Sequence, residues 1–78
     1  MKLTLYHFQS CTYCKRVREY LKNHGISVEM KDIHENPSFK RELLGLGGKT
    51  QVPCLAINGK TLYESMSIIE WFKKNYKK

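Results

Sequence analysis

The sequence predicts a small α/β protein with a mixed four-stranded sheet flanked by three helices. The hydrophobic pattern changes from a period of two to a helical period, and an Asn-Gly pair later joins two short strand-like runs. The predicted elements follow the order β-α-β-α-β-β-α, which gives a parallel first strand pair and an antiparallel hairpin. We expect residues 1–78 to form a single domain that buries about 60% of the surface of the unfolded chain.

The first strand and the first helix follow from a change in periodicity. Residues 2–8 alternate between two faces, as is typical of a strand. From Thr12 the apolar positions, including Val17, recur at helical spacing, while charged side chains such as Arg18 are expected to face water. We expect Gly25 to end this helix.

The second strand and helix are shorter. Residues 26–33 are predicted to form a strand with Met30 on its apolar face. Asn36 is a favoured N-cap and Pro37 a favoured first helical residue, so a helix is expected to start here. Gly45 is expected to close it.

The second half begins with a hairpin. Residues 52–57 form an apolar run interrupted only by Pro53, a residue that marks an edge, a bulge or a cis bond in a strand. Asn58-Gly59 predicts a tight turn into an antiparallel strand at residues 60–63.

The last helix is predicted from an apolar stripe made of Ile68, Ile69, Phe72 and Tyr76. Ser65 or Ser67 could cap its start, and Ser67 with Glu70 fits a capping box. Basic residues near its end, Lys73, Lys74, Lys77 and Lys78, complement the helix dipole.

The composition narrows the function classes. A net charge of +7 is spread along the chain without an aromatic-basic motif, so we interpret it as a solvated basic face and expect no nucleic-acid or membrane partner. No apolar run approaches the roughly 20 residues of a membrane span. The first residues lack a signal-peptide pattern, so we expect a cytoplasmic protein.

The cysteines carry the chemical signal. Cys11 follows the first strand at the start of a helix, where unpaired backbone N–H groups favour a thiolate. Cys14 lies one turn further, on the same side, close enough to form a disulfide with Cys11. The histidines lack zinc-finger spacing, so no metal site is expected. Cys54, inside an apolar strand, is interpreted as a small buried hydrophobic residue.

With these features together, the chain resembles the glutaredoxin family through Cys11-Thr12-Tyr13-Cys14 and through Thr50-Gln51-Val52-Pro53. The resemblance implies a thioredoxin-like fold and a cis Val52–Pro53 peptide. It also implies that Pro53 faces the cysteine pair, that the Val52 backbone binds glutathione, and that Tyr13 flanks it. Lys49 and Gln51 are weaker candidates for the glycyl carboxylate of glutathione.

A second stretch, residues 62–69, is similar to the Glu-Ser region in the amino-terminal domains of glutathione transferases. This similarity implies that Glu64 and Ser65 hold the γ-glutamyl end of glutathione. The chemistry agrees, because a hydroxyl and N–H groups at a helix start can bind the α-carboxylate while a carboxylate binds the α-amine.

The resemblance implies a glutathione-dependent thiol–disulfide oxidoreductase that uses Cys11 and Cys14 on glutathionylated or disulfide-containing proteins. We expect it to be a monomer with glutathione as co-substrate. The family motif usually has Pro where this chain has Thr12, which leaves the redox potential open. Two alternatives remain: a carrier of a [2Fe-2S] cluster ligated with glutathione, and a redoxin reduced by thioredoxin reductase.

Overall fold

The computed structural model describes residues 2–76, and its elements follow the predicted order. They are β1 (Leu3–His7), α1 (Thr12–Asn23), β2 (Glu29–Asp32), α2 (Pro37–Gly47), β3 (Cys54–Ile57), β4 (Lys60–Tyr63) and α3 (Ser65–Asn75). No helix in this part of the chain is long and apolar enough to cross a membrane.

The four strands form one mixed sheet in the order β2-β1-β3-β4. β1 pairs in parallel with β2, and the β1–β3 and β3–β4 pairs are antiparallel. This confirms the predicted parallel beginning and hairpin. Asn58 and Gly59 form the hairpin turn with φ values of 51° and 89°, the left-handed conformation that such turns require.

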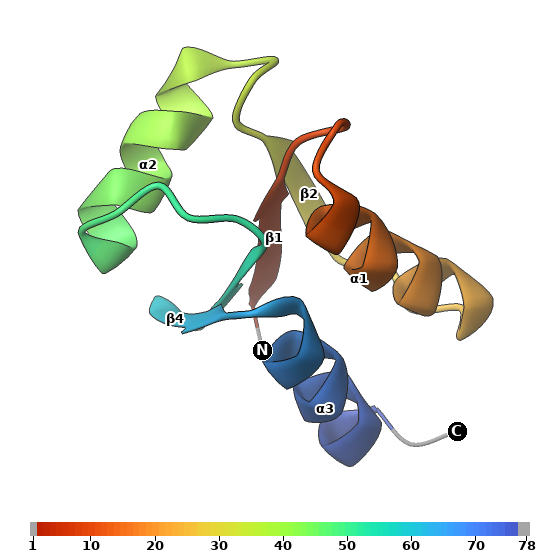
Figure 1. Cartoon of the computed structure of the whole chain (residues 1–78). Helices are drawn as coiled ribbons and strands as arrows, with labels where there is room; N and C mark the ends of the chain where they lie inside the picture. The colour runs from red at the N-terminus through yellow and green to blue at the C-terminus, as the bar shows by residue number, and fades with distance from the viewer. Residues whose placement is uncertain (1, 77–78) are drawn as a thin grey trace.

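Helices cover both faces of the sheet, with α2 on one side and α1 and α3 on the other (Figure 1). All five residues of β1 are buried, because this central strand faces a core on each side. Leu5 packs in the core under α1 and α3, with Val17 and Phe72. Tyr6 packs in the smaller core under α2, with Leu43 and Cys54. The sheet therefore fixes the starts of α1 and α3 on the same face.

Two predictions for the second strand and helix are wrong. β2 is only four residues long, and Met30 is 40% exposed, because β2 lies at the edge of the sheet. Gly45 does not end α2. The helix continues to Gly47, and Gly48 ends it with φ 75° while donating its N–H to the Leu44 carbonyl.

The predicted capping of the last helix is also wrong. The N-cap is Glu64, and no side chain forms a capping hydrogen bond there. Ser65 is the first residue of α3, and Ser67 lies inside the first turn. The reason is the short connection: β4 ends at Tyr63, so the chain must reverse at Glu64, which adopts φ 74°.

Tyr63 on β4 packs against Gly47 at the end of α2. A Cβ at position 47 would clash with the Tyr63 hydroxyl. This hydroxyl is buried without a hydrogen-bond partner among the described residues. The Cys54 thiol lies near it, but no hydrogen bond of good geometry joins the two groups. Position 47 therefore has no room for a side chain.

We expect Gly47→Ala to destabilise the fold by about 1–3 kcal/mol, because the clash exceeds the gain of about 1 kcal/mol in helix propensity. Tyr63→Phe should be neutral or stabilising, because it removes an unsatisfied buried hydroxyl. The double variant should recover part of the loss. Urea unfolding of the three variants measures this coupling, and strictly additive free energies would contradict the contact.

Candidate thiol site at the start of helix α1

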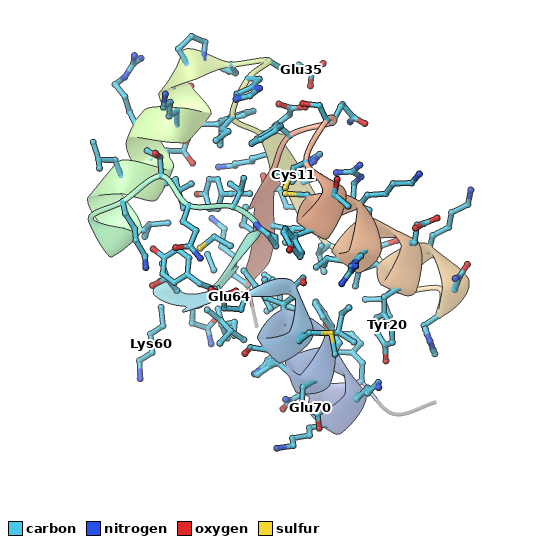
Figure 2. All side chains as sticks on the ribbon, viewed as in Figure 1. Cys11, Tyr20, Glu35, Lys60, Glu64 and Glu70 are labelled. Carbon is cyan, nitrogen blue, oxygen red and sulfur yellow. The ribbon has the colours of Figure 1, made fainter. Side chains whose placement is uncertain are left out.

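Cys11 is the N-cap of α1, with an extended backbone (φ −80°, ψ 115°). Its Sγ accepts a hydrogen bond from the Cys14 backbone N–H at 3.2 Å, in the way that a Ser or Asp oxygen caps a helix. No acidic residue lies in the first turn, and Cys11 is partly exposed. Figure 2 shows its sulfur at the open end of the helix. Cys11 is therefore the accessible thiol, beside the positive end of a helix dipole.

Cys14 is fully buried one turn further along the same helix. Burial, together with a hydrogen bond with Cys11, raises the pKa of its thiol to about 12. The proximity predicted for the two cysteines is confirmed, and their environments differ strongly. At neutral pH Cys14 is a thiol held beneath Cys11, while Cys11 is the sulfur that a substrate can reach.

The loop before Cys11 is held by Arg18. Its Nη1 donates to the Phe8 carbonyl at 3.3 Å and lies 3.3 Å from His7 Nδ1, and its Nη2 donates to the Gln9 carbonyl at 3.4 Å. The expectation that Arg18 faces water is therefore wrong. The sequence held one signal: Arg18 lies four residues after Cys14, on the same side of the helix.

Behind this loop, His7 is buried opposite Asp32 on the neighbouring strand. Burial and the charge of Arg18 lower the pKa of His7, so its ring is neutral at pH 7 and can accept the Arg18 hydrogen bond. Burial acts to raise the pKa of Asp32, but hydrogen bonds from the backbone N–H groups of His34 and Glu35 lower it overall. Arg18, His7 and Asp32 therefore form a connected group behind the loop that carries Cys11.

The Val52–Pro53 peptide is cis, as the resemblance implies. Pro53 is buried, while Val52 is half-buried. The predicted strand over residues 52–57 begins only at Cys54, because Pro53 has no N–H to donate to the sheet. Cys54 is fully buried, and burial raises the pKa of its thiol, which confirms its interpretation as a small core residue.

Glu64 and Ser65 lie at the start of α3, as Figure 2 shows for Glu64. Gln51 Nε2 donates to Glu64 Oε1 at 3.2 Å, so the segment before Pro53 is tied to this helix start. Ser65 is buried. Because no side chain caps α3, its first backbone N–H groups remain available to an anion.

The remaining candidate glutathione contacts are Tyr13 and Lys49. Tyr13, in the first turn of α1, is 59% exposed, and the Arg16 guanidinium lies 5.3 Å from its ring centre. The Lys49 ammonium lies 4.3 Å from the ring centre of Tyr63. Among residues 2–76, no group of three His, Cys, Asp or Glu side chains could hold a metal ion.

Comparison with known protein families gives one match over nearly the whole chain. The model described as "Glutathione S-transferase, N-terminal domain" matches residues 5–78. The curated relatives include prostaglandin E synthase 2 from Danio rerio, which is 32% identical over 97% of this chain and 19% of its own length. Glutaredoxin 3 from Escherichia coli strain K12 is 30% identical over 69% of this chain and 65% of its own length. The chain therefore spans less than two thirds of the length of each of these relatives.

Solved structures agree on the fold. The glutathione transferase Omega 3C from Trametes versicolor is 30% identical, with a TM-score of 0.82 over 97% of this chain and 34% of that chain. The thioredoxin-like protein BC3987 is 23% identical, with a TM-score of 0.77 over 94% of this chain and 97% of that chain. The predicted thioredoxin-like fold is confirmed.

Proposed function

The chain belongs to the glutathione S-transferase N-terminal domain family, and we propose that it is a glutathione-dependent thiol–disulfide oxidoreductase with Cys11 as its nucleophile. One observation carries this proposal: an accessible cysteine caps α1 directly above a buried, protonated one. A transferase that only activates the thiol of glutathione would need no such pair. The similarity to glutaredoxin 3 supports the same interpretation.

The reaction is an exchange between thiolate and disulfide. The Cys11 thiolate attacks the glutathione sulfur of a protein–glutathione mixed disulfide, the S–S bond breaks, and the protein leaves as a thiolate that takes up a proton. A second glutathione thiolate then attacks the glutathione sulfur bound to Cys11. Glutathione disulfide leaves, and Cys11 returns as a thiolate.

Protein disulfides would follow a two-cysteine route. Cys11 attacks one sulfur of the substrate and forms a mixed disulfide with it. Cys14 then loses its proton and attacks Cys11, which releases the reduced substrate and leaves a Cys11–Cys14 disulfide. Two glutathione molecules reduce this bridge and leave as glutathione disulfide. We propose that residues 1–78 act as one glutaredoxin-like domain in both routes.

Glutathione is proposed to bind between the starts of the two helices. The Val52 backbone would pair with its cysteinyl unit, and Tyr13 would flank it. The open N-terminus of α3 and Ser65 suit the α-carboxylate, and Glu64 suits the α-amine. Gln51 already donates a hydrogen bond to Glu64, so it would orient this carboxylate. It could also bind the glycyl carboxylate of glutathione.

Turnover of a glutathionylated peptide under two reducing systems tests the proposal. One system supplies glutathione, glutathione reductase and NADPH, and the other supplies thioredoxin reductase and NADPH. We expect NADPH consumption in the first system and little in the second. Activity confined to the second system would show that thioredoxin reductase, and not glutathione, reduces the protein. Inactivity in both systems would overturn the proposal.

A further inference from the structure

Arg18 links the two cysteines through Phe8, the residue that follows β1. The Phe8 carbonyl accepts hydrogen bonds from Arg18 Nη1 and from the Cys11 backbone N–H, at 3.3 Å and 3.2 Å. The Phe8 backbone also acts on the Cys14 thiol, whose pKa it lowers. Phe8 therefore neighbours both cysteines, and Arg18 holds its carbonyl in place.

Arg18 also supplies charge. Its guanidinium lowers the pKa of Cys14, against the larger effect of burial, whereas Cys11 raises it. On β1 the nearest titratable group is His7, which is neutral because burial and Arg18 lower its pKa. On β2, Asp32 faces His7. Arg18 is therefore the cation of this group that favours the Cys14 thiolate.

We propose that Arg18 is a positioning residue that enables Cys14 to resolve mixed disulfides formed at Cys11. This inference rests on the proposed function of Cys11 and extends it to the second thiol. In the resolving step the Cys14 proton passes to solvent and the Cys14 thiolate attacks Cys11 Sγ. The Cys11–substrate S–S bond breaks, and the substrate leaves as a thiolate while the Cys11–Cys14 disulfide forms.

The size of the effect follows from thiol chemistry. The rate of attack by Cys14 is proportional to its thiolate fraction, and this fraction falls when the cation is removed. A less acidic thiol is a better nucleophile, which offsets about half of the loss on a logarithmic scale. We expect Arg18→Met to slow closure of the Cys11–Cys14 disulfide by about three- to tenfold. Attack by an external thiol on Cys11 does not use Cys14, so it should change less than about twofold.

The experiment uses an aromatic disulfide reagent that leaves a coloured thiolate. The full chain is loaded at Cys11 with 5-thio-2-nitrobenzoate at low pH and then brought to neutral pH. First-order release of colour, with mass spectrometry of the product, reports closure by Cys14. In a Cys14→Ser background, β-mercaptoethanol supplies the external attack on the same adduct. Because the reagent replaces glutathione, the result does not depend on the glutathione activity proposed above.

Three substitutions separate charge from general structure. Arg18→Met should slow closure but not external attack. Arg18→Lys, which keeps the cation, should restore closure to within about threefold of wild type. Lys22→Met, which removes an exposed cation from the last turn of α1, should match wild type. The inference is overturned if Arg18→Met closes as fast as wild type, if it slows both attacks equally, or if Arg18→Lys is as slow as Arg18→Met.

Discussion

Cys11→Ser is expected to lower turnover of a glutathionylated peptide by at least about a thousandfold, because a serine hydroxyl is not ionised at neutral pH and cannot attack the disulfide. Neither remaining cysteine can replace it. Cys14 and Cys54 are both fully buried, and burial raises the pKa of both thiols. The readout is kcat/KM in the assay with glutathione, glutathione reductase and NADPH.

Cys14→Ser is the matched control, since it removes a sulfur one helical turn away. It should keep deglutathionylation within about tenfold of wild type, because that route needs only one thiol. It should lose reduction of a peptide disulfide. Retention of more than a tenth of wild-type deglutathionylation by Cys11→Ser would assign the chemistry to another group.

Phe72→Ala is expected to destabilise the fold by about 3–5 kcal/mol. Phe72 is the largest fully buried side chain and fills the core between α3, α1 and the sheet. Its ring also contacts those of Trp71 and Tyr76, with centroids 5.2 Å and 5.5 Å away. A domain of this size typically has a total stability of about 4–12 kcal/mol, so the substitution removes a large part of it.

Urea unfolding at neutral pH measures this effect, with Met66→Ala as the control on the same helix. Met66 is 66% exposed, so its truncation should change the free energy of unfolding by less than about 0.5 kcal/mol. A loss below about 1 kcal/mol for Phe72→Ala would contradict the packing of α3 described above.

The element order was predictable because each element has a local signal. Asn36-Pro37 starts α2, and Asn58-Gly59 forms the hairpin turn, as the turn and cap preferences of these residues require. The errors lie where tertiary context outweighs local preference. A glycine within a helix costs only about 1 kcal/mol, so Gly45 did not end α2.

The cysteine pair was also visible from sequence, since Cys11 follows an apparent strand and Cys14 follows at helical spacing. The hydrogen bonds that hold the loop before Cys11 could not be predicted from sequence. The sequence pattern places Arg18 on the surface, and its contacts with Phe8 and Gln9, which follow β1, depend on how α1 crosses the sheet. Likewise, the capping pattern at Ser67 is local, whereas the start of α3 is set by where β4 ends.

The most direct measurement of the central claim is mass spectrometry of the trapped intermediate. The Cys14→Ser variant is mixed with a glutathionylated peptide without free glutathione, quenched with acid, and digested for peptide mapping. The proposed mechanism predicts one glutathione attached to Cys11 and a released, reduced peptide. Attachment of the peptide instead of glutathione, attachment at Cys54, or no adduct would contradict it.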